Sequence, residues 1–182
     1  MQPTFETERL ILRPWMLTDA SAVRELAGER EVADTTLSIP HPYPEGAAES
    51  WIGACRHRAS EGNGYSFAIV RKDRQMLIGC ISLNIAKPHR RGELAYWVGS
   101  SFWGNGFATE AAKQIVRYGF LELNLNKINA AAMTRNPASS NVMIKVGMQH
   151  EGTFKQQIRK WDEYEDLVYY GLTRTDYDKM NG

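Results

Sequence analysis

A glycine-rich turn between a strand pattern and a helix pattern, in the middle of the chain, most constrains how this sequence can fold. Residues 93–98 read ELAYWV and have the aromatic and β-branched content of a strand. From Thr109 onward, apolar residues recur at helical spacing as far as Leu123. Residues 103–108 read WGNGFA, and the two glycines let the backbone approach a ligand without a Cβ in the way. The sequence therefore predicts a strand, a tight turn and a helix.

A turn of this kind is suited to binding an anion such as pyrophosphate. Its amide N–H groups adjoin the first N–H groups of the helix, which lack helical partners and lie at the positive end of the helix dipole. A Walker loop is excluded because no Gly-Lys-Ser/Thr follows the glycines. A dinucleotide-binding oxidoreductase remains an alternative, although Thr109 replaces its third glycine. The structural alternative is a turn that only ends a strand and starts a helix.

Further motifs accompany the turn in a fixed order along the chain. Residues 8–14 read ERLILRP, residues 95–99 read AYWVG, and residues 136–141 read NPASSN, followed by Val146-Gly147-Met148 and Glu151-Gly152. Together with the turn, these runs resemble the GNAT acyltransferase superfamily in its RimJ/RimL-like branch, whose acetyl-CoA motif corresponds to residues 95–111. The resemblance extends from about Thr7 to Tyr170, so it covers nearly the whole chain.

The resemblance implies an α+β fold with a mixed, mostly antiparallel central sheet, helices on both faces and splayed central strands. The length of 182 residues suits a single domain, 1–182. Patterning predicts strands at 10–12, 65–70, 76–83, 93–98, 127–134, 148–156 and 166–172, with a hairpin turn at 72–75. It also predicts helices from a cap at Thr18 to Gly28, from near Glu45 to Gly62, from Thr109 onward, and at 139–146.

The composition bounds the partners and the compartment. Lysine and arginine number 22 against 21 acidic residues, a formal net charge of +1, so no overall field favours nucleic acid or an anionic membrane. No apolar run approaches the roughly 20 residues of a membrane-spanning helix. Cys55 and Cys80 lie in apolar patterns, which favours buried, reduced thiols in a cytoplasmic protein. The four histidines are scattered, so we expect no metal site.

The resemblance assigns most of the turn and the strand before it to acetyl-CoA. The pantetheine arm is expected between the splayed strands, near Trp97 and Val98. The expected pyrophosphate-binding residues of the turn are Trp103, Gly104, Asn105, Gly106, Phe107, Ala108 and Thr109. The first of these is often Gln or Arg in the superfamily. Because the bonds come from main-chain N–H groups, the departure at Trp103 is expected to cost little phosphate affinity. Asn136 is expected to bind the amide groups of the cofactor.

Acetyl transfer to an amine needs a group that accepts the amine proton, and donors to the carbonyl oxygen and the departing thiolate. By resemblance, Glu93 holds the strand position of a base, which acts directly or through a water; the alternative is an ion pair with Arg90 or Arg91. A main-chain N–H near Val98 is expected to hold the oxyanion. Ser139 is expected to bind the cofactor and donate to the leaving sulfur; its alternative role is a helix cap.

Two departures from the family pattern leave a second class of function open. Many superfamily members use a tyrosine in the last helix as a donor to the thiolate, and this sequence has Met143 at that position. RimL-like enzymes have a general base in the following strand, and this sequence has Ile158 there. The leading prediction is an N-acetyltransferase that moves acetyl from acetyl-CoA directly, in a ternary complex, to a primary amine, either a protein N-terminal α-amine or a small amine. The alternative is a non-catalytic acyl-CoA-binding or sensor module.

Two further segments bear on partners. Residues 39–44 read IPHPYP, and three prolines stiffen this loop; it is either a wall of the acceptor site, with His41 facing the acceptor, or a rigid connection between helices. Near the C-terminus, Trp161, Tyr164 and Tyr169 are candidates for a homodimer interface.

Overall fold

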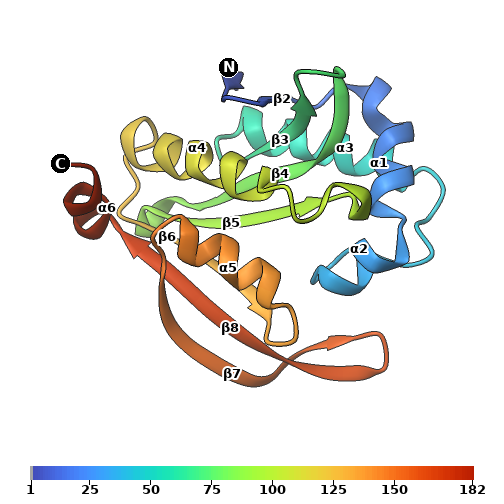
Figure 1. The fold of residues 1–182 in the computed structure, drawn as a ribbon. Coiled ribbons are helices and arrows are strands. Elements are labelled where there is room, and N and C mark those ends of the chain that lie inside the picture. Colours follow the sequence, from blue (N-terminus) through green and yellow to red (C-terminus); the bar gives the residue numbers. More distant parts are fainter. Residues whose placement is uncertain (1) are drawn as a thin grey trace.

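Eight strands form one sheet in the computed structural model, which describes residues 2–182 (Figure 1). The strands are β1 (Phe5–Glu6), β2 (Leu10–Pro14), β3 (Gly64–Arg71), β4 (Met76–Ala86), β5 (Arg91–Val98), β6 (Lys127–Met133), β7 (Gln149–Lys160) and β8 (Glu163–Thr173). They lie in the order β1-β2-β3-β4-β5-β6-β8-β7. Only the β5–β6 pair is parallel within the described chain. The mixed, mostly antiparallel sheet is therefore as predicted.

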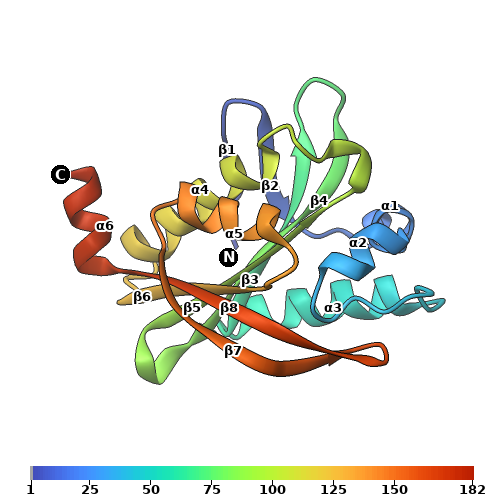
Figure 2. The same ribbon diagram turned by 60° about the horizontal axis from the view of Figure 1, so that its bottom comes forward.

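Helices cover both faces of this sheet, as Figure 2 shows for α3 and α4. The helices are α1 (Ala20–Ala27), α2 (Arg30–Thr35), α3 (Ala47–Ser60), α4 (Phe107–Leu121), α5 (Pro137–Lys145) and α6 (Arg174–Asn181). Residues of α4 and α5 share one buried cluster with Leu94 and Val98 of β5. Residues of α1 and α3 share the other cluster, against which Trp97 packs. Because successive side chains of a strand point to opposite faces, β5 contributes to both layers.

Strands β5 and β6 separate after a short parallel ladder. Their register runs from Arg91↔Lys127 to Glu93↔Asn129, and no later pair between them occurs in residues 2–182. Beyond this fork, β5 stays paired with β4 as far as Val98, and β6 stays paired with β8 as far as Met133. The two strands therefore diverge with unpaired edges facing each other, which confirms the predicted splay.

Several element boundaries differ from the predictions. The central helix begins at Phe107 rather than Thr109. Helix α5 was predicted over 139–146 with Pro137 at its start, and it runs from Pro137 to Lys145. Residues 156–166, expected as a loop, belong largely to a hairpin in which β7 runs on to Lys160 and β8 starts at Glu163. Most of β7 is exposed, so no alternation of apolar and polar residues marks it in the sequence.

Three short elements were not predicted at all. These are β1, α2 and α6, and each is too short or too polar to show a hydrophobic period. Both cysteines are buried free thiols, as expected. Trp161 and Tyr164 are exposed near the tip of the β7–β8 hairpin, and the homodimer interface stays a prediction. Within residues 2–182, no helix combines the length and apolarity needed to span a bilayer.

Candidate active site

The glycine turn presents free main-chain N–H groups at the start of α4. Gly104 and Gly106 have φ of 75° and 77°, in the left-handed region that favours glycine. Gly106 is the N-cap residue, and no side chain caps the helix. The Asn105 side chain donates to the carbonyl oxygens of Phe102 and Trp103, both at 3.0 Å, and so stabilises the turn from within. The first N–H groups of α4 are therefore available to an anion.

Arg9 ties this turn to the N-terminal strand. Its Nη1 donates to the Asn105 carbonyl at 2.9 Å, and its Nε donates to Glu110 at 2.7 Å. The guanidinium also lies over the Phe107 ring, 4.6 Å from the centroid. Burial disfavours the ionised Glu110 carboxylate, but hydrogen bonds from Thr7 and Arg9 outweigh this and hold its pKa below the ordinary value. The sequence placed Arg9 only in a strand motif, because no local spacing reveals a contact across 101 residues.

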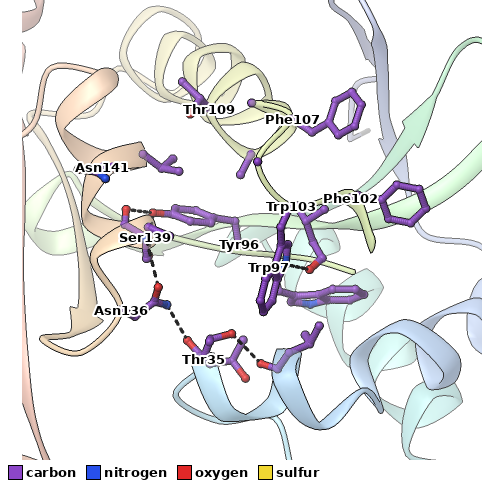
Figure 3. Close-up of a pocket in the computed structure, with 18 of the residues that line it drawn as sticks. Thr35, Tyr96, Trp97, Phe102, Trp103, Phe107, Thr109, Asn136, Ser139 and Asn141 are labelled. Carbon is purple, nitrogen blue, oxygen red and sulfur yellow. Dashed lines mark hydrogen bonds between the residues drawn. The ribbon is translucent and has the colours of Figure 1, made fainter. Parts of the chain in front are cut away.

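A cavity of about 320 Å³ opens beside the turn, between β5 and α5 (Figure 3). Its lining includes nearly all of the predicted cofactor residues, namely Trp97, Val98, Trp103, Gly104, Gly106, Phe107, Ala108, Thr109, Asn136 and Ser139. Asn105 is the exception, because it supports the turn and does not line the cavity. The fold thus brings together two motifs that are about 30 residues apart in the sequence.

At the end of β5, the main-chain N–H and C=O groups of Val98 point into the gap between the splayed strands β5 and β6. The Gly99 N–H donates to the Ile78 carbonyl on the β4 side at 2.9 Å. Because successive residues of a strand direct their N–H and C=O groups to opposite sides, those of Val98 point into the gap. The Trp103 indole donates to the Val98 carbonyl at 2.7 Å, in agreement with this direction. The Trp103 side chain therefore joins the glycine turn to β5 by a hydrogen bond. The sequence alone did not predict this role.

Tyr96 and Ser139 join β5 to α5 at the edge of this cavity (Figure 3). The Tyr96 Oη lies 2.7 Å from the Ser139 carbonyl oxygen and 3.0 Å from Ser139 Oγ. The cap of α5 is Asn136, whose Oδ1 accepts from the Ser139 N–H at 3.3 Å. Burial raises the pKa of Tyr96 to about 12, against the opposing effect of its bond to Ser139. The phenol is therefore neutral near pH 7, and the Ser139 hydroxyl does not serve as the cap.

A second cavity, of about 460 Å³, lies on the opposite face of β5. Small side chains form its floor, because Ser66, Ser82 and Ala95 lie side by side on β3, β4 and β5. Ala131 of β6 lines the cavity as well. Its walls include Ile39, Pro40 and Tyr43 of the proline-rich loop, together with Trp51 and Arg58 of α3. Of the two alternatives for this loop, the structure shows that it borders a cavity, although His41 lines neither cavity; its role as a wall of the acceptor site stays a prediction.

The two cavities adjoin at the fork between β5 and β6. Five residues line both of them: Thr35, Thr36, Tyr96, Trp97 and Ser139. A group bound in the gap between the strands is therefore accessible from both faces of the sheet. An arrangement of this kind suits a reaction between two molecules that enter from opposite sides.

Comparison with known proteins identifies the family. The model of the acetyltransferase (GNAT) domain matches residues 9–149. The chain belongs to the GNAT acetyltransferase family. The uncharacterized N-acetyltransferase YoaA of Bacillus subtilis is 34% identical over 171 residues, which are 93% of this chain and 96% of the relative. The predicted family is confirmed, and the protein is an N-acetyltransferase rather than an oxidoreductase. The RimJ/RimL-like branch has partial support, since the putative ribosomal N-acetyltransferase YdaF of Bacillus subtilis is 33% identical over 103 residues, which are 56% of each chain.

Solved structures of GNAT proteins share the fold. An acetyltransferase (GNAT family) from Bacillus anthracis has a TM-score of 0.84 at 26% identity, covering 95% of this chain and 99% of that one. RimL, a ribosomal L7/L12 alpha-N-protein acetyltransferase in complex with coenzyme A, has a TM-score of 0.87 at 16% identity, covering 94% and 98%. The second likeness concerns the fold alone.

Glu93 of this GNAT protein lines the second cavity and is exposed. The ion pair considered from the sequence is not formed, because Arg90 donates instead to the Asn124 carbonyl and no pair of Glu93 with Arg91 occurs in residues 2–182. Its neighbours across the strands are Asn84 and Asn129. The buried Oδ1 of Asn129 lacks a hydrogen-bond partner within the described chain. Glu93 therefore lies between two carboxamide side chains, and it forms no ion pair within residues 2–182.

Other residues singled out in the sequence lie apart from this chemistry. Met143 lines the second cavity, where a thioether offers no donor. Ile158 lies in β7 and lines neither cavity. His41 is exposed, with Nδ1 3.2 Å from the Gly28 carbonyl oxygen. Across residues 2–182, the His, Cys, Asp and Glu side chains never gather in threes suited to holding a metal ion.

Proposed function

We propose that this N-acetyltransferase moves the acetyl group of acetyl-CoA directly to a primary amine in a ternary complex. The observation that carries the proposal is the junction of two cavities at the fork between β5 and β6. Acetyl-CoA occupies the cavity beside the glycine turn, and the amine enters from the opposite face. The acceptor is either a protein N-terminal α-amine, the class that RimL, by its name, acetylates, or a small amine.

The residues of the first cavity fit the chemistry of coenzyme A. The free N–H groups at the start of α4 bind the pyrophosphate, and the edge of β5 near Trp97 and Val98 binds the pantetheine arm. Asn136 uses one proton of its Nδ2 on the Thr35 carbonyl, at 3.2 Å, which leaves the other proton for a cofactor amide. The main-chain origin of most of these bonds explains why Trp103 is tolerated at the first position of the turn.

The reaction forms a C–N bond and breaks a C–S bond. The neutral amine attacks the thioester carbonyl, and the Val98 N–H, which points into the gap, stabilises the oxyanion. Glu93 accepts the amine proton through a water, because its carboxylate lines the acceptor cavity and forms no ion pair within residues 2–182. When the C–S bond breaks, the electron pair stays on sulfur, and the Ser139 hydroxyl donates a hydrogen bond to the thiolate.

The direct test is calorimetric titration with acetyl-CoA, followed by measurement of thiol release in the presence of short peptides and of small amines. We expect binding, and acceptor-dependent release with one of the two classes. Release with a peptide assigns the N-terminal α-amine, and release only with a small amine assigns the other class. Binding without release from any acceptor would overturn the proposal in favour of a sensor module.

Glu93→Gln should lower kcat about 100-fold near pH 7, because a positioned base contributes on the order of 10² to 10⁴ in rate. The loss should shrink as the pH rises, since hydroxide can then accept the proton that the attacking amine releases. The dissociation constant of acetyl-CoA should not change, because Glu93 lies in the second cavity. Steady-state kinetics between neutral and alkaline pH measure this. Glu122→Gln, an exposed change at the end of α4, is the control and should keep full activity.

Arg9→Ala should weaken coenzyme A binding about tenfold, because charge-assisted hydrogen bonds of this kind contribute about 1.5–3 kcal/mol and here they hold the turn in place. Calorimetric titration measures the change. Arg117→Ala removes an exposed arginine from α4, the helix that follows the turn, and should leave the affinity as it is. Equal affinities for the two variants would show that the turn keeps its shape without Arg9.

A further inference from the structure

Tyr96 lies at the place where the two cavities meet, and neither the base nor the oxyanion site makes use of it. Its side chain comes from β5, two residues before Val98, and is largely buried. Helix α5 has Met143 where many family members carry a tyrosine, so the phenol here comes from a strand instead. Figure 3 shows the ring reaching across to Ser139 on α5. The hydroxyl group therefore contacts the residue that is proposed to bind the leaving sulfur.

The phenol has one proton and two acceptors within hydrogen-bond distance. One acceptor is the Ser139 carbonyl oxygen at 2.7 Å, and the other is Ser139 Oγ at 3.0 Å. If the phenol donates to the carbonyl, the serine hydroxyl can donate to Tyr96 Oη, and its proton is then occupied. If the phenol donates to Oγ, the serine proton is free to point into the cofactor cavity, which Ser139 lines. Both arrangements keep every proton on its own oxygen.

We propose that Tyr96 is a positioning residue that directs the Ser139 proton at the sulfur of coenzyme A. As negative charge develops on sulfur, the phenol shifts its hydrogen bond from the Ser139 carbonyl to Ser139 Oγ, and the serine proton turns toward the sulfur. No proton leaves either oxygen. The sulfur keeps the electron pair of the broken C–S bond, and the thiolate is later protonated by water. This proposal rests on the proposed function, in which Ser139 donates to the thiolate.

A chain of two hydrogen bonds suits this thiolate better than proton transfer from the phenol. A thiol ordinarily has a pKa near 8.5, so a thiolate near neutral pH is a better leaving group than an alkoxide and needs only a hydrogen bond. Burial makes the Tyr96 phenolate costly, which keeps the phenol a permanent donor to serine. The side chains of Tyr96 and Val98 also lie on the same face of β5. One strand therefore positions the Val98 N–H for the carbonyl oxygen and, through Tyr96, the Ser139 hydroxyl for the sulfur, the two atoms that gain negative charge.

The competing explanation is that Tyr96 only fastens α5 to β5. In that case the bond to the Ser139 carbonyl matters, and this bond remains when Ser139 is replaced by alanine. The two explanations therefore differ in how the effects of two substitutions combine. Residues that act through one another are non-additive, whereas independent effects multiply.

The experiment is a double-mutant cycle of Tyr96→Phe and Ser139→Ala, with an acceptor on which the wild type turns over. We expect each single variant to lower kcat about tenfold, with the KM for acetyl-CoA within about twofold, and the double variant to be no slower than Ser139→Ala. A further tenfold loss in the double variant would overturn the proposal and establish a fastening role. Full activity of Ser139→Ala would overturn it as well. Lack of wild-type turnover on every amine and peptide would instead count against the proposed function.

Two more variants distinguish the loss of a specific hydrogen bond from a general loss of folding. Tyr118→Phe removes another buried phenol, which lines neither cavity, and should leave kcat unchanged. Ser139→Thr keeps a hydroxyl group, so it should restore most of the activity lost in Ser139→Ala and make turnover sensitive to Tyr96→Phe again. If Ser139→Thr is active and the addition of Tyr96→Phe does not change its kcat, the proposal is wrong. This outcome counts even if Tyr96→Phe alone is poorly folded.

Discussion

Replacing Gly106 by valine should abolish measurable coenzyme A binding in a protein that still folds. Gly106 holds φ of 77° and ψ of 8° at the N-cap of α4. A β-branched residue in this left-handed conformation costs on the order of 1–3 kcal/mol, so the turn would relax toward negative φ. That rotation moves the N–H groups that are proposed to hold the pyrophosphate. We expect an affinity loss of about 100-fold or more, by calorimetric titration.

The chain provides a closely matched control for this change. Gly46 is the N-cap of α3, with φ of 71° and ψ of −6°, and a Cβ there would meet no atom within 4 Å. At Gly106, the nearest atom to such a Cβ is Nη2 of Arg9, at 3.6 Å. Gly46→Val therefore has the same backbone cost without steric overlap, far along the chain from the cofactor cavity. Its thermal unfolding should resemble that of Gly106→Val, while its coenzyme A affinity stays that of the wild type. Similar coenzyme A affinities for both valine variants would show that the glycine turn does not bind the cofactor.

The sequence was informative where function depends on local backbone geometry. The glycines at 104 and 106 mark left-handed positions, and the strand and helix patterns beside them lie where the structure has β5 and α4. Anion binding by a turn and a helix start depends on main-chain groups, so a short run of residues suffices to predict it. Recognition of several ordered motifs then implied the splayed sheet, which the short β5–β6 ladder confirms.

Contacts between distant segments were not accessible in the same way. The bond of Tyr96 to Ser139 joins residues 43 apart, and that of Arg9 to Glu110 spans 101 residues. No periodicity or spacing predicts which side chains meet once a sheet is assembled. The sequence has Met143 at the helix position of the family tyrosine, yet the fold brings the phenol of Tyr96 to the same region from β5. The hollow floor of the second cavity likewise depends on strand register, which places Ser66, Ser82 and Ala95 side by side on β3, β4 and β5.

Filling that floor should abolish acetyl transfer and leave cofactor binding intact. Ala95 lines the second cavity and is exposed there, in a strand where a phenylalanine has good β propensity. Because the side chain points into open space, Ala95→Phe should cost little stability, unlike the overpacking of a closed core. The new ring would occupy the place of the acceptor. We expect acceptor-dependent turnover to fall about 100-fold or more, which corresponds to roughly 3 kcal/mol in the transition state.

Ala86→Phe is the matched control, since Ala86 is also at a strand position but lines neither cavity. It should retain the wild-type kcat and KM. The acetyl-CoA affinity of both variants should equal that of the wild type, because the cofactor cavity lies on the other face of β5. Full activity of Ala95→Phe would show that the acceptor binds outside the second cavity. The junction of the two cavities could then no longer support direct transfer. A loss of acetyl-CoA binding in this variant would mean instead that the second cavity holds part of the cofactor.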